Sequence, residues 1–195
     1  ALMVATAASG MSRPSTGQHR ASALGTRYDA FCSERYVLTL DNRALRDIAQ
    51  HAPYEFIAIL VNGETYGGGG IHGQFSTAAA GSEWAPYLMV HEFGHHFAAL
   101  ADEYYTSPVS YAAASGRREP WETNVTAGTD RATLKWRALV EADTPLPTPW
   151  PKAEFEAFQR GIQAQRKALR EQGRPEAEMN ALFRREQAHV EGLFS

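Results

Sequence analysis

Residues 91–105 read HEFGHHFAALADEYY, and the first five of them predict a metal site on a helix. His91 and His95 are four residues apart, so both imidazoles lie on one helical face and reach a single ion. Zinc takes such nitrogen ligands and lowers the pKa of a water molecule from ~15.7 toward ~7. Glu92 flanks the pair and is expected to accept the proton of that water. We therefore predict one Zn²⁺ ion per chain, bound by His91 and His95, with Glu92 as general base.

A zinc hydrolase also needs a third protein ligand. The common long signature places Gly and His at positions 98 and 101, where this chain has alanines. Asp102 follows, but on a straight helix it would lie about 16 Å along the axis from His91. We predict Asp102 as the third ligand on the condition that the helix breaks between residues 96 and 101. The alternatives are Glu103, Glu119, Glu122 and a residue outside this chain.

The residues upstream of this helix predict alternating strands and helices. Residues 35–40 (RYVLTL) and 55–61 (EFIAILV) are expected as strands because aromatic and β-branched side chains cluster there. Asp41 is expected to cap a helix between them. Strand, helix and strand form a βαβ unit with parallel pairing, and the apolar second strand is expected at the centre of the sheet. Pro86 is expected to begin the metal-binding helix. The predicted class is therefore α/β.

Four consecutive glycines, residues 67–70, precede that helix. They do not form a phosphate loop, because no Gly-Lys-Ser/Thr follows them. Glycine allows another backbone to approach closely, and residues 74–80 are expected as a short exposed strand at the rim of the sheet. An extended peptide adds to such a rim by strand pairing. The candidate substrate-binding residues are therefore Gly68, Gly69, Gly70 and His72.

The C-terminal part of the chain is expected to be helical and more highly charged. Residues 130–141 are expected as a helix that buries Leu134, Trp136, Leu139 and Val140. Alternating prolines between residues 145 and 151 are typical of a stiff, extended linker. Beyond them, residues 152–172 and 175–191 carry apolar side chains at helical spacing. They predict a C-terminal helical hairpin.

Composition and charge exclude several classes of protein. The chain has 195 residues, of which 44% are hydrophobic and 21% charged, with a net charge of −3. No apolar run reaches the ~18 residues of a membrane-spanning helix, so membrane insertion is not expected. A dense basic stripe is missing, which argues against nucleic acid as a partner. The single cysteine, Cys32, excludes an internal disulfide framework, and the first residues do not have the pattern of a signal peptide.

The sequence resembles the IgA-peptidase family of bacterial zinc metallopeptidases, a metzincin-like group. The resemblance rests on residues 91–105, on residues 59–70 (ILVNGETYGGGG), and on residues 122–126 (ETNVT) followed by Lys135 and Trp136. It covers roughly residues 28–140. It implies a metzincin-like fold, with a twisted mixed sheet and an active-site helix, and export to the medium, the cell surface or the periplasm. Carried over position by position, it makes His91, His95 and Asp102 zinc ligands and Glu92 the general base.

Members of that family carry a Cys- and Met-bearing segment near the end, which forms a methionine turn beneath the zinc. The later methionine here, Met179, lies in a charged helical stretch, so we expect this chain to end before that segment. The expected organisation is an irregular N-terminal segment (1–27), a zinc peptidase domain (28–150) and a helical appendage (151–195).

The predicted function is that of a zinc-dependent endopeptidase that hydrolyses peptide bonds in an extended protein or peptide substrate. Tyr105, at the end of the motif, is a candidate for stabilising the oxyanion of the tetrahedral intermediate. The alternative function is a zinc-stabilised binding or adhesion module without turnover. The oligomeric state is left open by the sequence.

Overall fold

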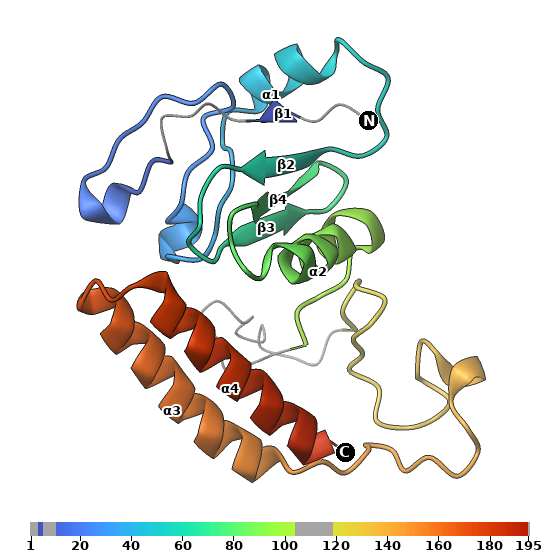
Figure 1. Ribbon diagram of the computed structural model, residues 1–195. Coiled ribbons are helices and arrows are strands. Elements are labelled where there is room, and N and C mark those ends of the chain that lie inside the picture. The colour runs from blue at the N-terminus through green and yellow to red at the C-terminus, as the bar shows by residue number, and fades with distance from the viewer. Residues whose placement is uncertain (1–3, 6–10, 104–118, 195) are drawn as a thin grey trace. The chain divides into compact units, whose positions relative to one another are not determined.

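The computed structural model describes residues 4–5, 11–103 and 119–194. The chain divides into two compact units, Ala1–Leu100 and Ala101–Ser195. Figure 1 shows the elements of each. Among the residues described, no helix combines the length and the apolar character that a membrane crossing requires.

Within the residues described, the first unit contains a four-stranded mixed sheet with two α-helices. The strand order is β1-β2-β4-β3, in which β2 pairs in parallel with β1 and β4, and β3 pairs antiparallel with β4. The predicted α/β class and mixed sheet are confirmed. The elements are β1 (Val4–Ala5), η1 (Pro14–Thr16), η2 (Ala30–Cys32), α1 (Asn42–Ala49), β2 (Ala58–Val61), β3 (Gly68–Ile71), β4 (Phe75–Ala79) and α2 (Ala85–Ala98).

Strand β4 is central, and the expectation of an exposed rim at residues 74–80 is wrong. All five residues of β4 are buried, because the strand lies between β2 and β3 and is covered on both faces. Phe75 points into the hydrophobic core on one face. On the other face, the Ser76 hydroxyl lies 4.0 Å from Met89 Sδ on α2. The sequence pattern of β4 lacked the long apolar run that usually marks a central strand.

Residues 35–40 do not form a regular strand, so the predicted βαβ pairing with residues 55–61 is wrong. Tyr36 makes an isolated parallel bridge to Gly68, and Leu38 an isolated antiparallel bridge to Arg27. The segment joins β3 at Gly68 alone, where the Val37 N–H donates to the Gly68 carbonyl and the Gly68 N–H donates to the Arg35 carbonyl. The Thr77 hydroxyl donates a hydrogen bond to the carbonyl of Val37. The parallel partners of β2 are therefore β1 and β4.

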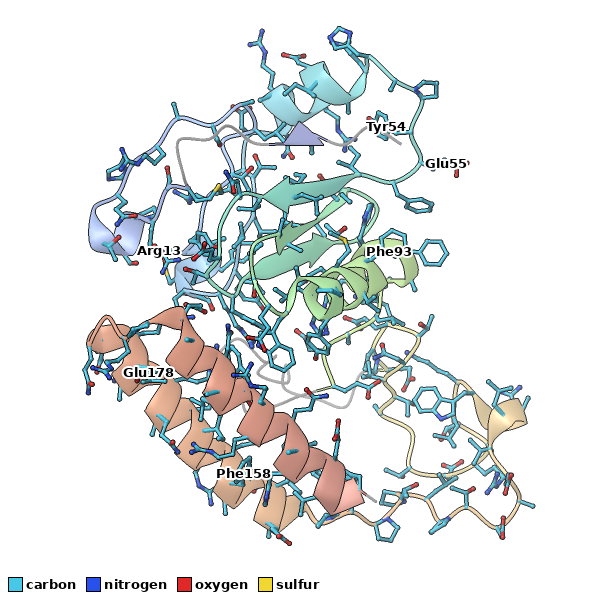
Figure 2. The ribbon with its side chains drawn as sticks, in the orientation of Figure 1. Arg13, Tyr54, Glu55, Phe93, Phe158 and Glu178 are labelled. Carbon is cyan, nitrogen blue, oxygen red and sulfur yellow. The ribbon has the colours of Figure 1, made fainter. Side chains whose placement is uncertain are left out.

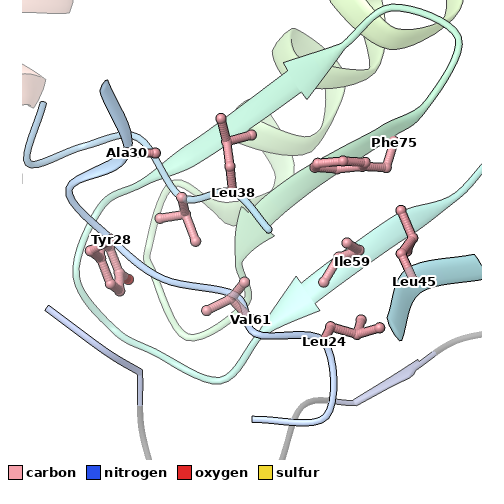
Figure 3. Packing of buried hydrophobic residues seen from close by; sticks show 9 residues of the cluster. Leu24, Tyr28, Ala30, Leu38, Leu45, Ile59, Val61 and Phe75 are labelled. Carbon is pink, nitrogen blue, oxygen red and sulfur yellow. The ribbon is translucent and has the colours of Figure 1, made fainter. Parts of the chain in front are cut away.

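The helix expected after Asp41 is present as α1. The Asp41 carboxylate accepts a hydrogen bond from the Ala44 N–H at 2.9 Å and caps the first turn. Leu45 of α1 enters a core on one face of the sheet, drawn in Figure 3, while α2 packs on β3 and β4. The core residues are Leu24, Tyr28, Ala30, Val37, Leu38, Leu45, Ile59, Val61 and Phe75.

The second unit contains the predicted helical hairpin, formed by α3 (Lys152–Glu171) and α4 (Glu176–Phe194). Gly173, with φ +60°, lies in the turn between the two helices. Phe158 of α3, labelled in Figure 2, stacks on the ring of His189 with a centroid distance of 3.7 Å. The contacts between α3 and α4 confirm this part of the prediction.

The helix expected over residues 130–141 is reduced to the short 3-10 turn η3 (Arg137–Leu139). Leu134 is buried as expected, but Leu139 is exposed. The prediction of a helix over residues 130–141 that buries Leu139 is therefore wrong. The Asp130 carboxylate accepts from the N–H groups of Ala132 and Thr133, and the Arg131 guanidinium donates to the carbonyl of Val140. Side chains that bind the local backbone in this way compete with helical hydrogen bonding.

Candidate metal centre

Helix α2 carries the candidate metal-binding residues, and one stripe along it faces the sheet. Pro86 lies in the first turn, where its missing N–H costs no helical hydrogen bond. The buried residues of α2 are Leu88, Glu92 and His96, which follow at intervals of four. Neighbouring positions on the helix are only partly buried. The helix therefore places Glu92 against the sheet and leaves the two metal-ligand candidates near solvent.

The glycines of β3 allow α2 to lie directly on the strand. A Cβ atom placed on Gly70 would lie 2.3 Å from the Glu92 carbonyl oxygen and 2.8 Å from His95 Cβ. A Cβ atom on Gly68 would lie 3.0 Å from Glu92 Cγ and 3.1 Å from its Oε1. Real side chains do not tolerate such approach to a helix backbone. Gly68 and Gly70 are therefore packing surface for the metal-binding helix, in addition to any contact with a substrate.

The imidazoles of His91 and His95 converge. Their Nε2 atoms lie 3.2 Å apart, and the ring planes meet at 88°. Two nitrogen ligands at the usual 2.0–2.1 Å from a tetrahedral zinc ion are about 3.3 Å from each other. The ligand atoms of His91, Glu92 and His95 all lie within 4.8 Å of one another. The donor set fits a divalent metal such as zinc.

The end of α2 fixes the orientation of His95. Ala99 has a left-handed φ of +54°, and the Leu100 N–H donates to the Gly94 carbonyl at 3.3 Å, so the chain turns sharply after Ala98. The Leu100 carbonyl then accepts a hydrogen bond from His95 Nδ1. Because a carbonyl only accepts, Nδ1 carries the proton and Nε2 keeps its lone pair for a metal. The helix break on which Asp102 depends is present.

His96 lies on the buried stripe of α2, about 100° around the helix from His95. It is 2% exposed and makes edge contacts with Phe56 and with Phe93 of α2. Figure 2 labels Phe93. Burial lowers the pKa of His96, and the charge of nearby His72 lowers it further. His72 itself is exposed, in the turn after β3, with its Nδ1 3.2 Å from the His96 carbonyl oxygen. His96 is a packing residue of the sheet-facing side.

The remaining candidates lie on other elements. Asp102 belongs to the second unit, and its role as third ligand stays a prediction, as do the substrate contacts of Gly68, Gly69, Gly70 and His72. Tyr105 lies outside the described residues. Glu119 accepts hydrogen bonds from the Ala127 N–H at 2.9 Å and the Thr126 hydroxyl at 2.8 Å, contacts that lower its pKa. Its carboxylate is thus already engaged by its own loop.

The family model described as IgA Peptidase M64 matches residues 1–195. The chain belongs to the IgA Peptidase M64 family. The match confirms the resemblance drawn from residues 28–140 and extends it over the whole chain. Membership of M64 supports a metallopeptidase that acts on proteins or peptides, with His91, Glu92 and His95 as a group that could bind a metal. No curated protein matches this sequence.

Two contacts around the M64 histidines were not expected from the sequence. The Tyr87 ring lies nearly parallel to that of His91, with centroids 6.0 Å apart and planes at 20°. Helical spacing could have indicated this pair, since Tyr87 precedes His91 by one turn. The Leu100 carbonyl beside His95 has no sequence signal, because every residue type supplies a carbonyl.

Proposed function

We propose that this M64 family member is a zinc-dependent endopeptidase of metzincin-like fold, with one zinc ion bound by His91, His95 and Asp102. The observation that carries the proposal is the 3.2 Å separation of the two Nε2 atoms beside the buried carboxylate of Glu92. A binding module would have no chemical need for that carboxylate. The family resemblance favours an exported protein, either secreted, periplasmic or on the cell surface.

The residues of α2 divide the chemistry between them. Zinc, when bound, supplies a Lewis acid that polarises a carbonyl and lowers the pKa of a nucleophilic water toward ~7. Glu92 accepts the proton of the attacking water and returns a proton to the leaving amine nitrogen. Its place against Gly68 fixes the carboxylate and restricts access of bulk water, since Glu92 is only 7% exposed. His95 keeps its tautomer through the Leu100 carbonyl.

The outer edge of β3 is the proposed place for the substrate backbone. The Ala79 N–H donates to the Gly67 carbonyl, so the odd-numbered residues of β3 pair with β4. Backbone groups alternate between the two edges of a strand, so those of Gly68 and Gly70 point to the outer edge. Gly68 already pairs there with the backbone of Arg35 and Val37, so the substrate backbone would pair at Gly70. Gly70 packs against His95, which brings this edge next to the metal site. An extended peptide that pairs there would run past His72.

The test is cleavage of an unstructured protein by the full chain, loaded with zinc and compared with Glu92→Gln. The expected result is cleavage that a chelator abolishes, and a Glu92→Gln variant that still binds one zinc but cleaves ~10²–10⁴-fold more slowly. Equal rates for the two proteins would overturn the mechanism. Zinc binding by both without cleavage by either would favour the binding module.

A further inference from the structure

The side chain of Asn124 pairs with the backbone of Ala101. Its Oδ1 accepts a hydrogen bond from the Ala101 N–H at 2.8 Å, and its Nδ2 donates to the Ala101 carbonyl at 2.9 Å. The same Nδ2 donates to Oε1 of Glu103 at 3.0 Å. Both hydrogens of the amide and its oxygen are therefore used. The contacts bracket Asp102, because they hold the residue before it and the residue after it.

The peptide group between Leu100 and Ala101 is held at both of its polar atoms. Its N–H donates to Asn124, and its carbonyl, that of Leu100, accepts from His95 Nδ1. Asp102 is two residues beyond Leu100, so their Cα atoms are at most about 7 Å apart. Rotation of this peptide plane would move the carbonyl that orients His95 and would also change the direction in which the chain reaches Asp102.

The loop that presents Asn124 is itself tied down. The Lys135 ammonium donates to the carbonyls of Pro120 and Glu122 and lies 3.4 Å from the Glu119 carboxylate. These contacts fix the residues just before Asn124, so its carboxamide is a stationary partner for Ala101.

We propose that Asn124 is a positioning residue of the metal centre: through Ala101 it sets the backbone of Asp102 and holds the carbonyl that orients His95. The inference rests on the proposed zinc site with Asp102 as third ligand. Asn124 touches neither metal nor substrate, and it acts through the groups that do. Partners of this kind, which orient metal ligands, typically change metal affinity by 10–100-fold when they are removed.

The experiment compares the full chain with Asn124→Ala, Asp102→Ala, the double variant and Thr126→Val. Thr126→Val is the matched control, because it removes hydrogen bonds to Glu119 and Gly128 in the same loop without touching residues 101–103. Zinc affinity is measured by competition with a chelating dye, and the coordination geometry by the visible absorption of the Co²⁺-loaded protein. Thermal unfolding by circular dichroism reports whether each variant folds.

We expect Asn124→Ala to bind zinc ~10–100-fold more weakly and to change the Co²⁺ spectrum, while Thr126→Val does neither. In the Asp102→Ala background, Asn124→Ala should weaken binding by less than it does alone, because part of its effect passes through Asp102. If Asn124→Ala does not fold, Asn124→Asp replaces it: an acceptor for the Ala101 N–H is kept, both donors are lost, and an intermediate loss is expected.

Different results would overturn the positioning role of Asn124 and the proposed metal site. Unchanged zinc affinity and an unchanged Co²⁺ spectrum in Asn124→Ala, with weaker binding in Asp102→Ala, would overturn the positioning role alone. Full additivity of the two substitutions would overturn it as well. Unchanged affinity in Asp102→Ala, or no zinc binding by the parent chain, would overturn the proposed metal site and with it this inference.

Discussion

The Nε2 atoms of His91 and His95 lie 3.2 Å apart, one helical turn from each other. Because Nδ1 of His95 donates to the Leu100 carbonyl, its Nε2 presents a lone pair toward His91. When the proton of His91 is on Nδ1, both lone pairs are directed at one point, where a divalent cation would be bound. The distance matches the separation of about 3.3 Å expected for two nitrogen ligands of one tetrahedral zinc ion.

Removal of either imidazole should abolish stoichiometric zinc binding. We expect His91→Ala and His95→Ala to retain far less than one zinc per chain after dialysis, because the remaining groups no longer provide two nitrogen ligands. His51→Ala is the control, since His51 is exposed and lies beyond the end of α1. Zinc content is measured by atomic absorption. Normal zinc content in either α2 variant would disprove the assignment.

Gly70→Ala should destabilise the first unit. The added methyl group meets the Glu92 carbonyl at 2.3 Å and His95 Cβ at 2.8 Å, so strand or helix must shift. Overpacking of this kind costs about 1–3 kcal/mol. Gly161→Ala, in α3, is the control with the opposite sign: its Cβ meets nothing within 4 Å, and alanine stabilises a helix by about 0.5–1 kcal/mol. Urea denaturation followed by circular dichroism measures both, and equal midpoint shifts would contradict the packing argument.

Ala99→Gly should stabilise the turn that ends α2. Ala99 adopts φ +54°, a region that costs an ordinary residue roughly 1 kcal/mol and glycine almost nothing. Ala98→Gly, at the last helical residue, should instead destabilise by about 0.5–1 kcal/mol. The difference in thermal unfolding between the two variants checks the geometry of the turn. A less stable Ala99→Gly would show that the turn differs from the one described.

The helices could be predicted because their signals are local. Asp41 caps α1, Pro86 lies in the first turn of α2, and apolar residues recur at helical spacing in α3 and α4. The order of strands could not, since pairing joins residues far apart in the chain. Thr77 and Val37, for example, are bonded across forty positions, and nothing local distinguishes that contact.

The residues of the candidate site could also be predicted only where their signal is local. His91, Glu92 and His95 follow from spacing on one helix, and the structure brings them together. For Gly70 the sequence predicted only that another backbone approaches it closely. It did not predict that this backbone is that of α2, because the sequence does not say which helix lies on the strand. Asn124 was missed as a site residue, since its partner is a backbone that any residue at position 101 would offer.

The loop around Glu119 should become less stable at acidic pH. The Ala127 N–H contributes most to lowering the pKa of Glu119 below its ordinary 4.5, and the Thr126 hydroxyl and Lys135 add to it. A carboxyl group whose pKa is lower in the folded state contributes stability above its unfolded value. That stability is lost as the pH falls from about 4.5 through the folded pKa. In Glu119→Gln the side chain does not titrate, so the stability difference from the parent should shrink as the pH is lowered through this range.

Carboxyl NMR titration checks the assignment directly. The Glu119 resonance should titrate below pH 4.5 in the parent chain. In Thr126→Val, which removes one of its donors but keeps the stronger Ala127 N–H, the pKa should rise part of the way toward its ordinary value. A Glu119 that titrates at its ordinary pKa in both proteins would mean that the carboxylate is not held by this loop, and Glu119 would then return as a candidate metal ligand.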